Sequence, residues 1–136
     1  MKINTIFSLQ RGLSLIFVAV MAILSNEQVS AQSNIRYMRI AKIVVDSSQL
    51  EKYKAALKES IETAVRLEPG VLSLNAVYEK DNPTHVIVFE IYASEDAYKA
   101  HIQTAHFKKY KDAVKDMVKS LELVDVVPIA FESKPK

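Results

Sequence analysis

Residues 85–92 are His85-Val86-Ile87-Val88-Phe89-Glu90-Ile91-Tyr92, and this stretch decides the fold. Successive side chains of an extended chain point to opposite sides, and here both sides are apolar apart from Glu90. A strand that is apolar on both sides is typical of the centre of a sheet whose two faces are covered. The sequence therefore predicts a central strand at 85–92, and each face of its sheet needs a cover.

The segment before this strand predicts a strand followed by a long helix. Residues 35–45 are rich in β-branched residues with polar ones interleaved, which is typical of a strand. Ser48 and Glu51 have the spacing of a capping box, which predicts a helix start. Apolar residues then recur at helical spacing until Pro69 and Gly70 end the pattern. The amphipathic face of this helix must cover a sheet.

The other segments complete the pattern. Residues 71–79 alternate as a strand does and join the central strand through a turn at 80–83. Ser94 and Thr104 each precede a helical pattern, so we expect two helical pieces joined by a bend, with an apolar stripe continuing to Met117 and Val118. Residues 121–131 predict a last strand, with Pro128 at a sheet edge or crossing point.

The order of the predicted elements is β-α-β-β-α-β. That order is the α+β, ferredoxin-like arrangement, a four-stranded antiparallel sheet with helices on one face. The other face of the sheet is left bare and apolar. A second copy related by two-fold symmetry is the simplest cover, so we expect a homodimer, an α+β barrel made by two protomers.

Composition excludes several classes of protein. The chain has 136 residues, 49% of them hydrophobic, with a net charge of +2 and no cysteine. Scattered basic residues give no electrostatic surface for nucleic acid, so no nucleic-acid partner is expected. Without cysteine there is no disulfide, thiolate metal site, cysteine nucleophile or thioether-linked lipid. We accordingly expect no bound metal.

The N-terminus predicts a cleaved signal peptide. Lys2 and Arg11 precede an apolar segment at 13–24, which is shorter than the roughly 20 residues that span a bilayer. The small-residue pattern Val29-Ser30-Ala31 follows at cleavage distance. We expect residues 1–31 to be removed, leaving one domain at 32–136 that is periplasmic or secreted, with no stable membrane anchor. The alternative is an uncleaved N-terminal anchor.

Two motifs resemble one known family. Residues 89–92, Phe-Glu-Ile-Tyr, are followed at 97–107 by Ala-Tyr-Lys-Ala-His-Ile-Gln-Thr-Ala-His-Phe. These resemble the E-x-W/Y and A-x-x-x-H-x-x-T-x-H-F patterns of the antibiotic biosynthesis monooxygenase family. Glu68-Pro69-Gly70, before the second strand, also resembles that family's E-x-G. The resemblance covers about residues 39–131 and implies the dimeric α+β barrel fold.

The resemblance implies a cofactor-independent monooxygenase that acts on a small quinol, phenolic or polycyclic aromatic substrate with O₂. The absence of a Gly-rich dinucleotide loop agrees with having no cofactor. Two alternatives stay open on the same scaffold: an isomerase of a small hydroxy-dione, and a non-catalytic barrel that binds small ligands. Haem degradation is disfavoured, because the chain lacks the Trp of that branch.

Two histidines are the candidate catalytic groups. His101 lies beside the apolar face of the short helix and is the first choice of base. The alternative is a structural histidine bonded to Glu90 or to a backbone carbonyl. His106 lies two positions after Thr104, where the helix dipole favours a neutral ring that assists; alternatively it closes the bend.

Four further residues are expected to line a substrate pocket. Glu90 is the only charge in the central strand, so we expect a partner such as His101, Arg39 or Lys42. It either orients a base or forms a structural ion pair. The other expected lining residues are Tyr92, Asn75 and Tyr110. Tyr92 and Asn75 could instead be dimer contacts.

Overall fold

The computed structural model describes residues 36–134. Its elements in chain order are β1 (Tyr37–Val45), the 3-10 turn η1 (Ser47–Gln49), α2 (Leu50–Leu67), β2 (Val71–Tyr78), β3 (His85–Tyr92), α3 (Glu95–His101), α4 (Ala105–Val114) and β4 (Val118–Val126). The signal peptide expected at 1–31 lies outside the described residues. No helix within 36–134 is long and apolar enough to cross a membrane.

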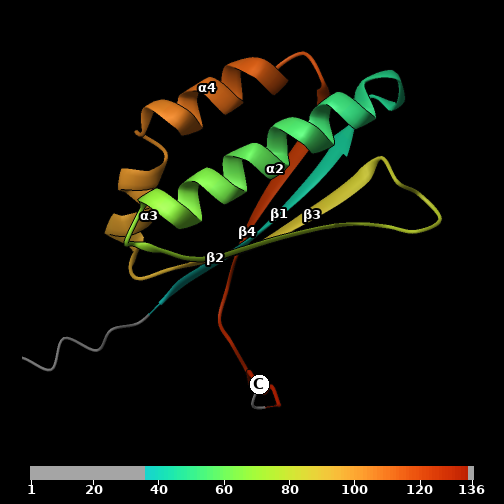
Figure 1. The fold of residues 1–136 in the computed structure, drawn as a ribbon. Helices are drawn as coiled ribbons and strands as arrows, with labels where there is room; N and C mark the ends of the chain where they lie inside the picture. The colour runs from blue at the N-terminus through green and yellow to red at the C-terminus, as the bar shows by residue number, and fades with distance from the viewer. Residues whose placement is uncertain (1–35, 135–136) are drawn as a thin grey trace, which may run out of the picture. The chain divides into compact units, whose positions relative to one another are not determined.

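The four strands form one antiparallel sheet in the order β2-β3-β1-β4. The helices lie on one face of this sheet, with α2 and α4 side by side across it (Figure 1). This is the ferredoxin-like α+β arrangement, and it places β3 and β1 at the centre, the position that the apolar sequence of 85–92 predicts for β3. The central strand has the predicted bounds, His85 to Tyr92.

The core lies between the sheet and the helices. Its larger cluster joins β1 and β3 to α2 through the buried Tyr53 and Leu57, and Val114 of α4 completes it. A smaller cluster of Ala64, Val71 and Tyr92 lies where α2 meets the start of β2. Burial of these side chains stabilises the fold, since each buried large apolar side chain contributes about 1.5–3 kcal/mol.

The start of the long helix differs from the prediction. Ser48 and Glu51 do not form a capping box. Instead the side chain of Asp46 accepts hydrogen bonds from both the backbone N–H and the hydroxyl of Ser48, at 2.8 and 2.6 Å. Asp46 thus takes the Ser48 N–H that Glu51 would accept in the box, and the chain makes a 3-10 turn before α2 begins at Leu50. A hydrogen bond from Ser48 and the nearby Lys119 hold the pKa of Asp46 at about 2.

The last strand also differs from the prediction. Helix α4 ends at Val114, and β4 runs from Val118 to Val126 rather than over 121–131. Met117 and Val118, predicted to extend the helix, still pack against the core. Pro128 lies beyond the strand. A register shift at the start of β2 also turns Val71 toward the helices, out of the predicted alternation.

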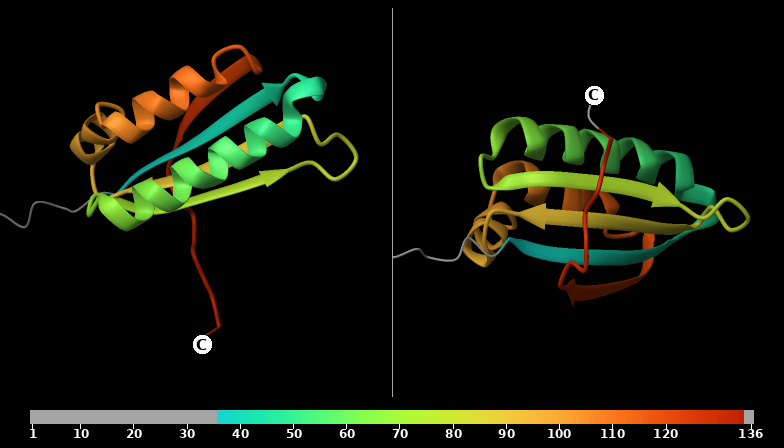
Figure 2. Two further views of the ribbon diagram at one scale, coloured as in Figure 1. Left: turned by 45° about the horizontal axis from the view of Figure 1, so that its top comes forward. Right: turned by 90° about the horizontal axis from the view of Figure 1, so that it is seen from below.

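One face of the sheet has no helix over it. Figure 2 shows this face, with the segment that follows β4 crossing it. Phe131 in that segment lies with its ring centroid 5.9 Å from that of Phe89, which points to this face from β3. Val127 and Ile129 of the same segment are exposed. The bare sheet face predicted from sequence is therefore present, and the chain's own C-terminal segment covers part of it.

Candidate active site

A cavity of about 390 Å³ lies between the helix-covered face of the sheet and the helices. Its walls are mainly aliphatic and aromatic and come from all four strands and all three helices. The aromatic side chains among them are Tyr53, Tyr92, Tyr98, Phe107 and Tyr110. His101 and Glu90 are among its few ionisable groups. A small, mostly apolar cavity with a few converging polar groups has the character of a ligand site.

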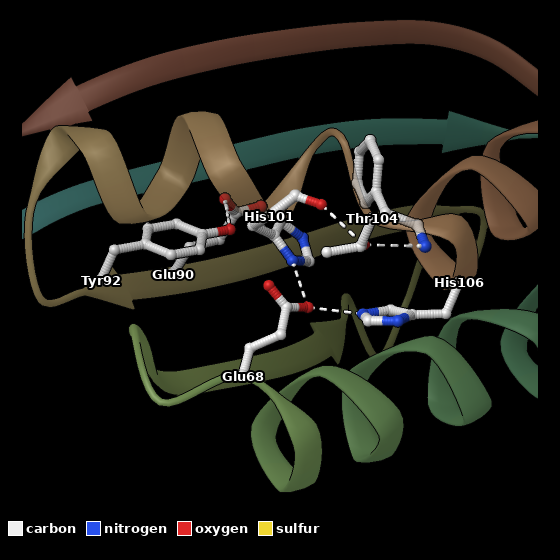
Figure 3. Close-up of polar contacts among 7 residues, drawn as sticks. Glu68, Glu90, Tyr92, His101, Thr104 and His106 are labelled. Atoms are coloured by element: carbon white, nitrogen blue, oxygen red, sulfur yellow. Dashed lines mark hydrogen bonds and ion pairs between the residues drawn. The ribbon is translucent and has the colours of Figure 1, made fainter.

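Three side chains form a polar cluster (Figure 3), and one of them, His101, lines this cavity. Oε1 of Glu68 lies 2.9 Å from Nδ1 of His101 and 2.5 Å from Nε2 of His106. The side chains of Glu68 and His101 are 13% and 5% exposed, and that of His106 is 23% exposed. One carboxylate oxygen therefore serves both imidazole rings in a nearly dry environment. We call Glu68, His101 and His106 the Glu–His cluster.

The shared carboxylate fixes the tautomers of both rings. An ionised carboxylate oxygen only accepts hydrogen bonds, so each contacting ring nitrogen must carry a proton. His101 then has its proton on Nδ1 and a free lone pair on Nε2. Because His101 also lines the cavity, Nε2 is the nitrogen left to meet a bound molecule. This is the geometry of a general base whose orientation is set by a carboxylate.

Local capping holds the Glu–His cluster in place. Ser94 caps α3 by accepting from the N–H of Ala97, and Thr104 caps α4 by accepting from the N–H of Phe107, as the sequence predicts. The hydroxyl of Thr104 also donates to the carbonyl of His101 at 2.7 Å, which pins the bend between the helices. The two histidines are thus presented from two short helices joined by a fixed turn.

Glu68 is positioned by the end of α2. It is the C-cap residue, and its backbone N–H donates to the carbonyl of Ala64. Pro69 cannot continue the helix, so the chain leaves it here and turns into β2. Gly70 allows this turn to approach α3, since a Cβ at Gly70 would lie 2.6 Å from Cβ of Ala97. The close contact brings the end of α2 within reach of His101.

Glu90 and Tyr92 form a second polar pair in the cavity wall. The hydroxyl of Tyr92 donates to Oε2 of Glu90 at 2.9 Å. Burial raises the pKa of Glu90, although this hydrogen bond and the charge of Arg39 act in the opposite direction. Burial also raises the pKa of Tyr92, so that its hydroxyl stays protonated. The partner of Glu90 is therefore Tyr92, rather than the expected His101, Arg39 or Lys42.

Two residues that were expected to pair with Glu90 form ion pairs with other carboxylates. Arg39 pairs with Asp125 at 2.7 Å, and its guanidinium lies 4.3 Å from the ring centroid of Tyr98. The hydrogen bond from Arg39 lowers the pKa of Asp125. Lys42 lies on the other face of the sheet and pairs with Glu122. Arg39 thus contributes a positive charge to the cavity wall while its own charge is compensated.

The hydroxyls of Tyr53 and Tyr110 lie 3.1 Å apart between α2 and α4. Burial raises the pKa of both, so both stay neutral and can donate hydrogen bonds. Either hydroxyl can therefore orient an oxygen atom of a ligand without adding charge to the cavity.

Comparison with known proteins places the chain in a family. Residues 36–113 match the family described as antibiotic biosynthesis monooxygenase, which is more than half of the chain. The chain belongs to the antibiotic biosynthesis monooxygenase family. No curated protein matches the sequence.

Solved structures of candidate monooxygenases share the fold. One from Bacteroides thetaiotaomicron is 53% identical, covers 74% of this chain and 96% of its own, and has a TM-score of 0.70. One from Nitrosomonas europaea is 26% identical, with 71% and 92% covered and a TM-score of 0.66. A third, from Lactobacillus acidophilus, is 32% identical with a TM-score of 0.68; the match covers 69% of this chain but only 45% of that longer one.

The antibiotic biosynthesis monooxygenase match spans the whole Glu–His cluster. Of the residues predicted for the site, His101, Glu90, Tyr92 and Tyr110 all line the cavity. His106 joins His101 through Glu68 but is not itself part of the wall. Asn75 lies on the other face of the sheet, opposite Phe89, and donates to Ser73. The structure therefore brings five of the six predicted residues together and separates Asn75 from them.

Sequence reasoning missed Glu68 as a site residue. Glu68 was noted only as part of the E-x-G pattern that precedes the second strand. The alternative that bonded His101 to Glu90 or a backbone carbonyl is replaced by a bond to Glu68. One sequence feature could have indicated this contact: Glu68 lies at the predicted end of the long helix, and His101 and His106 lie on either side of the predicted bend. The cluster could also hold a metal ion, since its three donor atoms lie within 4.8 Å of one another.

Proposed function

We propose that this protein is a monooxygenase that needs no cofactor and oxidises a small quinol, phenolic or polycyclic aromatic compound with O₂. One observation carries the proposal: His101, held by Glu68 with Nε2 free, lines an apolar and aromatic cavity. Family membership supports the reaction class. The size and lining of the cavity support the substrate class.

The cavity suits a small aromatic molecule. Its volume of about 390 Å³ lies at the lower end of the range for ligand pockets, about 300–1,000 Å³. Tyr98 and Phe107 offer ring faces and edges against which a flat ring can stack. Hydroxyl groups on the ligand have neutral partners at Tyr53 and Tyr110.

The chemistry needs a base and a dry site. Nε2 of His101 takes a proton from a ring CH₂ group that a carbonyl of the same ring activates, as in an anthrone or in the keto form of a phenol or quinol, and the electron pair stays on the substrate. The carbanion donates electrons to O₂ and forms a C–O bond, giving a peroxide that takes the proton back from His101. Loss of the remaining C–H proton with hydroxide leaves a carbonyl and water. The substrate supplies all four electrons that reduce O₂.

The other members of the cluster act through His101. Glu68 holds the Nδ1 proton and stabilises the imidazolium that forms when Nε2 is protonated. His106 donates its own N–H to the same oxygen and keeps the carboxylate in place. Glu68 and His106 are therefore positioning residues in this scheme, and His101 is the catalytic residue.

Oxygen consumption tests the proposal. The purified, metal-stripped protein is incubated with a panel of quinols and anthrones, with and without O₂. We expect O₂ uptake matched by product, and a loss of about 10²–10⁴-fold in rate for His101→Ala. His85→Ala is the matched control, because His85 lies at the other end of β3 and contacts Glu79. Undiminished oxidation by His101→Ala would contradict the assignment of the base.

The same assay separates the alternatives. Product formed equally well without O₂ would indicate the isomerase of a small hydroxy-dione, which uses a base in the same position. Binding of panel compounds without turnover in any condition would indicate a ligand-binding barrel.

We also propose that the protein acts outside the cytoplasm, after residues 1–31 are removed. Support comes from the apolar segment at 13–24 and the small residues before Gln32. N-terminal sequencing of the exported protein should begin at Gln32. Recovery of the intact chain from a membrane fraction would contradict this proposal.

A further inference from the structure

The Glu–His cluster has the spacing of a metal site. Ligands bound at about 2.0–2.2 Å to one metal ion are roughly 3.0–3.5 Å apart in tetrahedral or octahedral geometry. Oε1 of Glu68 already lies 2.9 and 2.5 Å from the two imidazole nitrogens, and all three donor atoms lie within 4.8 Å. To replace the two hydrogen bonds, an ion requires the carboxylate oxygen to move slightly away from the two nitrogens and the nitrogens, which lie within 4.8 Å, to take up the spacing of ligands.

The site is preorganised and reachable. The end of α2 fixes Glu68, and the turn pinned by Thr104 fixes both histidines. His106 is the most exposed of the three and gives an ion its way in. Among residues 36–134, no lysine or arginine pairs with Glu68, so no fixed cation competes for the carboxylate.

The donor set selects the kind of ion. Two imidazole nitrogens and one carboxylate oxygen suit a divalent transition metal such as Zn²⁺. Mg²⁺ and Ca²⁺ prefer an all-oxygen shell. Three protein ligands also leave a position open for water.

We propose that the Glu–His cluster binds a divalent transition-metal ion, and that the ion and the catalytic base exclude each other. The second half of this statement rests on the proposed function. Metal binding uses the Nδ1 lone pair of His101, so the proton of the neutral ring must lie on Nε2. The proton leaves Nδ1 and another is taken up at Nε2 from solvent. The nitrogen that accepts the substrate proton thereby becomes a donor.

Calorimetry tests the site without reference to activity. The full metal-stripped protein is titrated with ZnCl₂, and we expect one ion per protomer. His106→Ala and Glu68→Gln should each weaken binding by more than about 100-fold, because the first removes a ligand and the second replaces an anionic ligand by a neutral amide. His85→Ala, which removes the exposed histidine beside Glu79, should leave binding unchanged. Circular dichroism checks that each variant is folded.

Equal affinity in the wild type and in both cluster variants would overturn the site, since the zinc would then lie elsewhere. Two variants are used so that a folding failure of one leaves the test intact.

Oxygen uptake tests the exclusion. Zinc should reduce the wild-type rate in proportion to its occupancy, and a chelator should restore it. The residual activity of His106→Ala should be insensitive to the same zinc concentration. Undiminished oxidation by the zinc-loaded protein would overturn the exclusion. Faster oxidation with metal bound would support the metal site and overturn the cofactor-free function. Absence of turnover in every condition would overturn the proposed function, and calorimetry would still decide whether the metal site exists.

Discussion

At the scale of single residues, His101 and His106 differ in what they can reach. Both share one oxygen of Glu68, but only His101 lines the cavity. The two candidate histidines thus differ in their access to a bound molecule. The difference arises because α3 ends at His101 against the sheet, whereas His106 lies in the first turn of α4.

Replacing Glu68 tests whether it orients the base. In Glu68→Gln the amide oxygen can take the place of Oε1 and accept both ring protons, but it is neutral and holds the Nδ1 proton of His101 less strongly than a carboxylate does. The preferred tautomer of His101 is weakened, and we expect kcat to fall about 10–100-fold with KM nearly unchanged. Steady-state kinetics on an oxidised panel substrate measure this split. A change confined to KM would contradict an orienting role.

Glu90 predicts a pH dependence of stability. Burial raises its pKa above the ordinary value of 4.5, so the folded protein holds this proton more tightly than the unfolded chain. As pH rises through 4.5 the unfolded chain loses the proton first, and this group's contribution to the free energy of unfolding falls. The contribution levels off above the raised pKa.

Glu90→Gln removes the titrating group, and with it this fall in the free energy of unfolding, while it keeps an oxygen that accepts the hydrogen bond from Tyr92. We expect the variant to gain stability relative to the wild type between pH 4 and pH 8, as measured by urea unfolding at each pH. Glu122→Gln is the control, because Glu122 is exposed and pairs with Lys42. A constant difference between Glu90→Gln and the wild type at every pH would rule out the titration of Glu90 as its cause.

At the scale of elements, predictions succeed where the signal is local. The central strand at 85–92 and the caps at Ser94 and Thr104 each depend on residues a few positions apart. Ser48 is not the cap because Asp46, two positions earlier, is the N-cap residue and accepts the N–H of Ser48. Glu68 was missed for the opposite reason. It lies 33 positions from His101, and their contact depends on how closely the end of α2 approaches α3.

That approach depends on Gly70. A methyl group at this position would lie 2.6 Å from Cβ of Ala97 in α3, closer than packed carbons allow. Gly70→Ala should therefore destabilise the protein by about 1–3 kcal/mol, as overpacking does, and move Glu68 relative to His101. Urea unfolding measures the cost. The double variant Gly70→Ala with Ala97→Gly should cost less than the sum of the two single variants, and strict additivity would show that this contact does not cause the loss.

At the scale of the whole molecule, the two faces of the sheet differ in what covers them and in which residues they carry. The helix-covered face holds the cavity and the cluster, and the open face carries none of the predicted site residues except Asn75. On this open face Ile40 of β1 lies opposite Phe89 of β3, and the apolar Ile87 lies two positions before Phe89, opposite Lys42. The C-terminal segment covers part of it through Phe131.

The open face predicts a homodimer. An apolar sheet face of this kind is stabilised when a second copy removes it from water, and a stable interface buries about 1,200–2,000 Å² in total. Because Phe131 already lies over Phe89, the second copy must pack against the C-terminal segment as well as the strands.

Light scattering on the mature chain should give twice the protomer mass. Val124→Lys places a charge on the open face in β4 beside Ile40 and should shift the mass toward that of one protomer. Lys52→Glu, on the exposed side of α2, should leave the mass unchanged. A wild-type protein that stays at the protomer mass at micromolar concentration would show that the C-terminal segment alone is sufficient cover.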